Sequence, residues 1–283
     1  MAPRSDPSAI RWLIGTEIAR IRKQAALSLA DIAKATGISK PKVGNMETGR
    51  FQQFPDDIAL VLEVCRADRR DIDRIVGLAA QQDAKTWWAA WSNVVPDWWK
   101  TFAGLEGLAD AAFTFQPLLV PGLLQTTDYA RAITVDTGFV RPDQTERFVS
   151  FRQARASRLT AEEPLTYHVV IGEPALRLAV GTVEQRRAQF EHVLELGRRN
   201  NVTIQILRPE DGAHPALAIG EFSVLDFSRA QSIAFSEMFD GAVYVQDADS
   251  IETYKMVAEN LRQVAQSPAA SVKTIKGFLE ALS

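Results

Sequence analysis

The segment SLADIAKATGISKPKVGNMETGR, residues 28–50, decides the fold of the amino-terminal part of this 283-residue chain. Ser28 can accept a hydrogen bond from the amides that open a helix, and Asp31 follows at the spacing of a capping box. Gly37 permits the positive φ that ends a helix sharply, so the chain can reverse within a few residues. Ser39 is a typical cap for a second helix. The segment therefore predicts two short helices joined by a tight turn.

The small and apolar residues of this segment predict how the two helices pack. Ala33 is small, which lets two helices cross closely at a steep angle. Ile32 faces inward, and Val43 and Met46 lie three residues apart on the inner face of the second helix. The outer face of that helix then consists of Lys40, Pro41, Lys42, Gly44 and Asn45.

This outer face has the side chains that DNA recognition uses. Lysines near a helix N-terminus neutralise phosphates or reach guanine, and an asparagine amide pairs with an adenine edge, each good base contact discriminating by about 1–3 kcal/mol. Asn45 is the best candidate for specificity, and Gly44 indicates close approach to a DNA backbone or to a neighbouring helix. The predicted DNA-contacting residues are Ser28, Ser39, Lys40, Pro41, Lys42, Gly44, Asn45 and Arg50.

Apolar stripes on both sides of the segment predict three more helices. Trp12, Ile14, Ile18 and Ile21 mark a first helix, and a fourth begins after Pro55. Ile72, Ile75 and Val76 mark a short fifth. We therefore expect an all-α, five-helix DNA-binding domain over residues 1–80.

Residues 11–77, and above all ISKPKVGNMETGR, resemble the Xre/Cro-type helix-turn-helix family, the group that includes the lambda repressor. The resemblance implies a lambda-repressor-like domain that binds double-stranded DNA. Family members often carry a phosphate-contacting glutamine at the start of the second helix, where this chain has Leu29. We therefore do not expect the usual phosphate contact at this position.

The charge distribution agrees with a DNA-binding amino-terminal part. The chain carries −3 overall, but residues 1–50 hold nine basic and four acidic side chains, so they carry +5 and the remainder −8. Phosphate attraction is local, so a basic module can act beside an acidic domain. There is no apolar run long enough for a membrane span and no signal core, so we expect a cytoplasmic protein. Cys65, the one cysteine, is expected to be a buried small hydrophobe.

Residues 81–283 are expected to form a second domain of the α/β (α+β) class with a mixed sheet. Four stretches read as strands: 165–173, 202–209, 221–227 and 242–247. The first two flank an amphipathic helix, 183–199, and so predict a β-α-β unit with parallel strands. Helices are expected at 249–265 and 268–282, and an alanine-rich helix after Thr101 is expected to lead into a loop.

Aromatic and basic residues mark two further stretches. Five of the six tryptophans lie in KTWWAAWSNVVPDWW, residues 85–99, which predicts a packed core or interface, with ligand stacking as the alternative. Arginines recur around residues 146–159, where neighbouring carboxylates favour a solvated, ion-paired face over a second nucleic-acid site.

Residues 85–280 resemble a domain of unknown function carried by many actinobacterial Xre-type regulators, most closely in WWAAWSNVVPDWW, PLLVPGLLQTTDYAR, VVIGEPALR and GAHPALAIGEFSVLDF. The resemblance implies an antitoxin-like regulator with a small partner protein encoded beside it. Glu173 and Arg177, one helical turn apart, form either an ion pair or a polar sensor site. The residues considered for a ligand or partner are Trp88, Trp91, Trp98, Glu173, Arg177 and His214.

No set of residues indicates catalysis. The three histidines have no metal-ligand spacing, and no nucleophile elbow, phosphate loop or dinucleotide pattern is present, so we expect neither enzyme activity, nor a cofactor, nor a metal. The sequence thus predicts a nucleoid-associated, sequence-specific transcriptional regulator that binds an inverted-repeat operator as a homodimer. Its second domain would bind a small partner protein, dimerise or both; the alternative is a small-molecule sensor in which the tryptophan-rich stretch forms the pocket.

Overall fold

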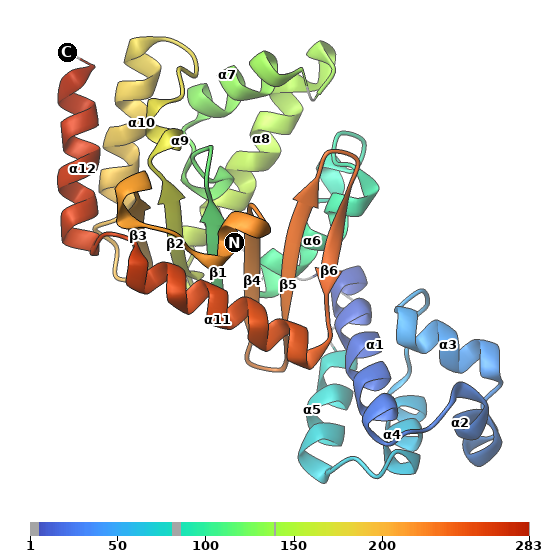
Figure 1. Ribbon diagram of the computed structural model, residues 1–283. Coiled ribbons are helices and arrows are strands. Elements are labelled where there is room, and N and C mark those ends of the chain that lie inside the picture. The colour runs from blue at the N-terminus through green and yellow to red at the C-terminus, as the bar shows by residue number, and fades with distance from the viewer. Residues whose placement is uncertain (1–5, 81–85, 139, 283) are drawn as a thin grey trace. The chain divides into compact units, whose positions relative to one another are not determined.

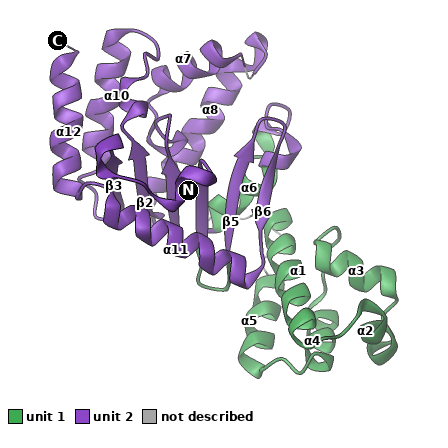
Figure 2. Cartoon of the chain, in the orientation of Figure 1, with its two compact units in different colours: residues 1–90, 100–108, 226–232 green, residues 91–99, 109–225, 233–283 purple. Residues whose placement is uncertain are grey.

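The computed structural model describes residues 6–80, 86–138 and 140–282 (Figure 1). The chain divides into two compact units (Figure 2). The first consists of residues 1–90, 100–108 and 226–232, and the second of residues 91–99, 109–225 and 233–283. The division differs from a single cut after residue 80, because two later segments of the chain belong to the first unit.

The first unit is built on five helices, as predicted. They are α1 (Pro7–Gln24), α2 (Leu29–Thr36), α3 (Lys40–Thr48), α4 (Pro55–Val64) and α5 (Arg69–Ala79). Their inward-facing residues form one core that includes Ile14, Ile32, Val43 and Ile58. Cys65 is part of this core, as expected, and burial raises the pKa of its thiol. Packing of one apolar stripe from each helix thus fixes the unit.

A tryptophan and a later helix complete the first unit. Asp6 caps α1 by accepting hydrogen bonds from the amides of Ser8 and Ala9, and it is fully buried. The indole N–H of Trp88 donates to the same carboxylate. Helix α6 spans Asp97–Leu108, and Gly104 on it lies so near Asp6 that a Cβ there would collide with the carboxylate. Trp88 is thus a structural partner of the helical core.

The second unit is built around a six-stranded sheet with the order β3-β2-β1-β4-β5-β6. The strands are β1 (Ala111–Gln116), β2 (Thr166–Gly172), β3 (Val202–Leu207), β4 (Phe222–Phe227), β5 (Ala230–Met238) and β6 (Gly241–Val245). β2 is parallel to both β1 and β3, whereas β5 and β6 are antiparallel. The mixed sheet and the parallel β2–β3 pair across a helix confirm the predicted β-α-β unit.

The second unit also contains several α-helices. They are α7 (Thr127–Thr137), α8 (Thr145–Ala156), α9 (Pro174–Arg177), α10 (Val183–Leu196), α11 (Ala248–Val264) and α12 (Pro268–Ala281). Ser267 caps α12, with Pro268 in its first turn. Helix α11 crosses one face of the sheet (Figure 1), where Ala258 and Leu261 pack with Phe113 and Val170 in one core cluster.

Two strands correct the sequence-based expectation. The alanine-rich helix was expected to lead directly into a loop at Pro117, but it ends at Leu108 and residues 111–116 form β1, a strand in the interior of the sheet. β1 does not alternate cleanly, because a strand between two others is covered on both faces. β5 was not predicted either, since its polar residues mask the pattern. Among the described residues no helix is long and apolar enough to cross a membrane.

Candidate nucleic-acid interface

The two helices of the quoted segment have the predicted caps and turn. Ser28 and Asp31 form a reciprocal capping box at the start of α2, with 2.8 Å from the Ser28 amide to the Asp31 carboxylate. Gly37 ends α2 with φ at +75°. Ser39 then caps α3 by accepting a hydrogen bond from the Lys42 amide at 3.4 Å. The hydroxyl groups of Ser28 and Ser39 thus accept hydrogen bonds from the first turns of α2 and α3. Contact of these two serines with DNA stays a prediction.

Helix α3 lies against the core by its inner face. Val43 is fully buried and Met46 is 4% exposed, so the opposite side of the helix is left to other residues. Lys40, Pro41 and Lys42 are exposed there. The sequence-based assignment of an inner and an outer face is confirmed.

Helix α3 is held rigidly against α1 at its carboxyl end. The Arg22 guanidinium donates to both carboxylate oxygens of Glu47, at 2.5 and 3.0 Å. The side-chain amide of Gln53, which is 2% exposed, donates to the main-chain carbonyls of Arg11 and Met46, each at 2.8 Å. These contacts fix the position of α3, and sequence reasoning missed both, because their partners lie far apart along the chain.

The outer residues of α3 differ in their partners. Lys42 pairs with Asp57 of α4 at 2.7 Å, although its side chain stays 51% exposed. Within the described part of the chain, Lys40 has no ion-pair partner and the side-chain amide of Asn45 has no hydrogen-bond partner. Asn45 uses its main-chain carbonyl to accept from the Thr48 hydroxyl at 3.2 Å. Lys40 and Asn45 are therefore available to a ligand at no cost in internal contacts.

Gly44 separates the two explanations left open by the sequence. A Cβ built at this position would meet only the side chain of Leu29, at 3.8 Å, which is ordinary van der Waals contact. No neighbouring helix therefore requires glycine here. The glycine costs α3 roughly 1 kcal/mol relative to alanine, and close approach to an external surface accounts for it better than internal packing does.

The two residues that flank this surface are less specific. Leu29 packs against the helical core, so it takes no part in a polar contact with phosphate. Arg50 is exposed, and its guanidinium lies over the Phe51 ring at 5.7 Å from the ring centre. Arg50 is therefore exposed to a phosphate, whereas Leu29 cannot make the phosphate contact that a glutamine would make at this position.

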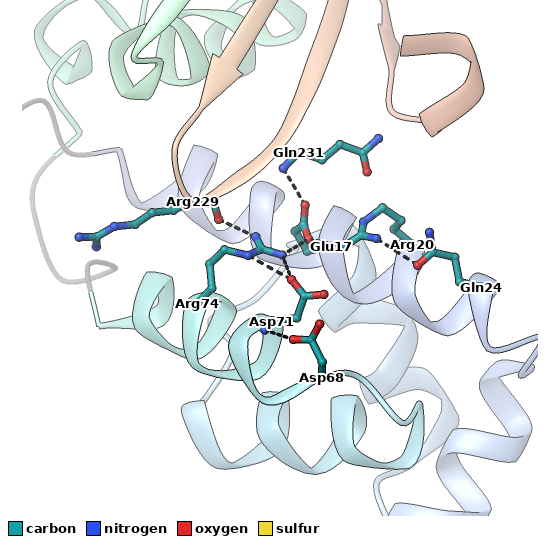
Figure 3. Close-up of polar contacts among 8 residues, drawn as sticks. All are labelled: Glu17, Arg20, Gln24, Asp68, Asp71, Arg74, Arg229 and Gln231. Carbon is teal, nitrogen blue, oxygen red and sulfur yellow. Dashed lines mark hydrogen bonds and ion pairs between the residues drawn. The ribbon is translucent and has the colours of Figure 1, made fainter. Parts of the chain in front are cut away.

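Two arginines of the first unit, Arg20 and Arg74, are paired with a buried carboxylate inside it (Figure 3). The Glu17 carboxylate, 1% exposed, pairs with Arg20 and Arg74, each at 2.8 Å, and accepts a hydrogen bond from the main-chain N–H of Gln231 at 2.7 Å. Arg74 also donates to the Arg229 carbonyl at 2.7 Å. These ion pairs hold the pKa of Glu17 below its usual range against the opposing effect of burial. These two arginines are therefore less available to DNA than Lys40 of α3.

Comparison with known families agrees with this geometry. Residues 13–75 match a helix-turn-helix domain, and residues 99–277 match the domain of unknown function DUF5753, which covers more than half of the chain. The chain belongs to the DUF5753 family. No curated protein and no solved structure matches it. A helix-turn-helix module on a larger domain is the arrangement of a DNA-binding regulator.

The remaining candidate residues of the DUF5753 protein are divided between the two units. Trp88 belongs to the first unit, while Trp91 and Trp98 belong to the second. Trp91 lies 6.0 Å from Phe151 between ring centres, and the Trp98 carbonyl accepts from the Tyr244 hydroxyl at 2.7 Å. A contact of these tryptophans with a ligand or partner stays a prediction.

Glu173 and Arg177 form the ion pair that their spacing allowed. Two guanidinium nitrogens of Arg177 lie 2.8 and 2.5 Å from one oxygen of Glu173, and the guanidinium also covers the Phe278 ring. His214 packs edge-on against Phe115 at 5.5 Å, and burial lowers the pKa of its imidazole. In the part of the chain that the structure describes, no three side chains are grouped as metal ligands.

Proposed function

We propose that this protein is a sequence-specific transcriptional regulator that reads its operator with helix α3 in the major groove. The observation that carries the proposal is the outer face of α3. It combines an exposed Lys40, an Asn45 amide without an internal partner, and a Gly44 that packing does not require. Asn45 reads adenine, Lys40 contacts phosphate, and Gly44 lets the sugar-phosphate backbone approach.

The ion pair of Lys42 with Asp57 defines a different role for that lysine. On DNA, Lys42 exchanges the half-buried Asp57 carboxylate, 22% exposed, for a phosphate, and ion pairs at the surface contribute only about 0–1 kcal/mol. Asp57 therefore weakens phosphate contact by Lys42 without abolishing it. Asp57→Asn should strengthen binding to all duplexes alike, because phosphate contacts carry no base information.

The decisive test compares two glycine variants on an operator selected from a random duplex library. Gly44→Ala should keep the fold and raise helix stability by about 1 kcal/mol, yet weaken operator binding measured by fluorescence anisotropy. Gly77→Ala is the matched control, because Gly77 is an exposed glycine in helix α5 with open space around it. It should gain stability with no change in affinity. Equal affinity of the two variants would refute close approach at Gly44.

Asn45→Ala tests base recognition separately. We expect loss of preference at one base pair, worth about 1–3 kcal/mol, whereas Lys40→Ala should weaken every sequence evenly and flatten the salt dependence. A library selection with Asn45→Ala that returns the wild-type consensus would remove Asn45 from the recognition surface.

Two further parts of the proposal concern assembly. The regulator binds as a homodimer to an inverted repeat, with half-sites roughly 34–36 Å apart. Light scattering of the protein on its operator tests this, and a complex with one chain per operator contradicts it. The support is the helix-turn-helix class itself, whose members commonly read two half-sites.

The proposed role of the second domain is antitoxin-like: it binds a small protein encoded beside it. The support is the family resemblance of residues 85–280. The regulator then acts in the cytoplasm, on the nucleoid. Co-expression with the products of adjacent genes, followed by affinity purification, tests the partner; the absence of any stoichiometric neighbour product would count against it.

A further inference from the structure

Two phenylalanines are exposed in the segment that joins α3 to α4, residues 49–54. Phe51 is 58% exposed and Phe54 is 56% exposed. Single apolar side chains at a surface are common and need no function. These two differ from such cases, because the segment that carries them is fixed on both sides.

Contacts with the main chain of α1 and α3 fix this segment. Gly49 has φ at +63°, and a Cβ there would lie 2.7 Å from the Arg11 carbonyl oxygen, so the chain passes directly against α1. The buried side-chain amide of Gln53 donates to the main-chain carbonyls of Arg11 and Met46, each at 2.8 Å. The segment is therefore held with Gln53 inward and the two phenylalanines at the surface.

The same segment runs beside α3, close to the residues of its outer face. Near the start of the segment, the Arg50 main-chain N–H donates to the Asn45 carbonyl at 3.3 Å. Just after its end, Asp57 of α4 pairs with Lys42 of α3 at 2.7 Å. Phe51 directly follows Arg50. When Asn45 contacts a base, Phe51 therefore lies within a few base pairs of it, at the roughly 3.4 Å spacing of stacked bases.

The charges beside the two phenylalanines are opposite. The Arg50 guanidinium lies over the Phe51 ring, 5.7 Å from the ring centre, and it forms no ion pair with any residue that the structure describes. Phe54 is followed by Asp56 and Asp57 in the first turn of α4. A phosphate backbone attracts the first place and repels the second. Contact of Phe51 with a second copy would bury the Arg50 charge without a partner, whereas DNA supplies the opposite charge.

We propose that Phe51 is a second base-reading residue: its ring contacts the C5-methyl group of a thymine in the major groove, while Arg50 binds a neighbouring phosphate. Thymine is the one base that presents a methyl group there, and a phenylalanine ring is among the apolar groups that contact it. The inference rests on the proposed function, since it requires that α3 enters the groove. It adds to the operator a thymine within a few base pairs of the adenine that Asn45 reads.

Replacement of thymidine by deoxyuridine tests the contact, because it removes the methyl group alone. Each thymidine of the selected operator is replaced in turn, and binding of the full chain is followed by fluorescence anisotropy. One position should weaken wild-type binding about fourfold, the value of one buried methyl group. Phe51→Ala should bind the unmodified operator about tenfold more weakly, with no further loss at that position. Phe51→Leu retains an apolar group and should keep part of the dependence on the methyl group.

Phe54→Ala is the matched control, because Phe54 has the same side chain and nearly the same exposure in the same segment. It should bind with wild-type affinity and keep the full dependence on the methyl group. If Phe51→Ala keeps that dependence as well, or if no thymidine of the operator responds to loss of its methyl group, the proposal is overturned.

A duplex with a single half-site separates contact with DNA from contact between two copies. The loss of affinity in Phe51→Ala should persist on the half-site, since the proposed contact lies within one copy and its own half-site. A loss confined to the complete inverted repeat would overturn the proposal in favour of a contact between copies. These outcomes leave recognition by Asn45 intact, whereas failure to select any operator would refute the proposed function and this inference with it.

Discussion

Gly15 on α1 gives the sharpest test of how the recognition helix is positioned. A Cβ at Gly15 would lie 2.5 Å from the Glu47 carbonyl oxygen and 2.7 Å from that of Met46. Both atoms belong to the main chain of α3, so no side-chain rotation relieves the collision. In Gly15→Ala the two helices must separate by roughly 0.5–1 Å to restore ordinary contact distances.

The magnitude follows from two opposing effects. Overpacking of this kind costs about 1–3 kcal/mol, here near the upper limit because the colliding atoms are main chain. Alanine in place of glycine returns about 1 kcal/mol of helix propensity. We therefore expect Gly15→Ala to lower the free energy of unfolding by about 2 kcal/mol. Gly77→Ala has the same propensity gain with open space around it, so it should raise stability by about 0.5–1 kcal/mol.

Urea unfolding followed by circular dichroism compares the two variants with the wild type. The expected difference between them is about 3 kcal/mol. Gly15→Ala should also weaken operator binding, because α3 shifts as a unit with the residues proposed to read the bases. A Gly15→Ala protein as stable as Gly77→Ala would refute the close approach of α1 and α3.

Three other substitutions test contacts within the first unit. Gln53→Ala should lower the free energy of unfolding by about 2–3 kcal/mol, because two main-chain carbonyls lose their donor. The control variant Gln52→Ala, at the exposed neighbouring residue, should change it little. Equal effects of the two variants would contradict the role assigned to Gln53. The folded-state pKa of Glu17 is below the ordinary 4.5, so its carboxylate stabilises the fold above that pH and loses this contribution as the pH falls through the folded-state pKa. Glu17→Gln should therefore be less stable than the wild type at pH 7 and lose less stability between about pH 5 and pH 3, and parallel acid titrations of the two proteins would be inconsistent with this. Trp88→Phe should cost about 1–2 kcal/mol, because it removes one donor from the buried carboxylate of Asp6 and keeps the ring; unchanged melting would show that this hydrogen bond contributes nothing.

The sequence predicted the five helices because their signals are local. Ser28 with Asp31, Gly37, and Ser39 lie within a few residues of the structures they specify. The β-α-β unit was predicted for the same reason: its strands and helix each carry their own periodicity. β1 was missed because a strand covered on both faces has no polar side to mark it.

Long-range contacts could not be predicted from local patterns. The burial of Arg155 depends on Trp99, and that of Glu17 on Gln231, more than two hundred residues away along the chain. From the sequence alone an arginine is expected at the surface, because no local pattern shows the aromatic ring that covers it. The candidate DNA-binding residues, by contrast, lie on one short helix, so their common face was visible in the sequence.

The composition of the first unit has a consequence for synthesis on the ribosome. Helices α1–α5 emerge early, but Glu17 can accept the hydrogen bond from the main-chain N–H of Gln231 only after most of the chain has been translated. Until then the Glu17 carboxylate has its two arginine partners but lacks the hydrogen bond from the Gln231 main-chain N–H. A nascent chain therefore carries an incompletely satisfied DNA-binding unit, and a fragment that stops at residue 80 keeps that state permanently. Complete folding of the first unit therefore requires that β5, which contains Gln231, has been translated.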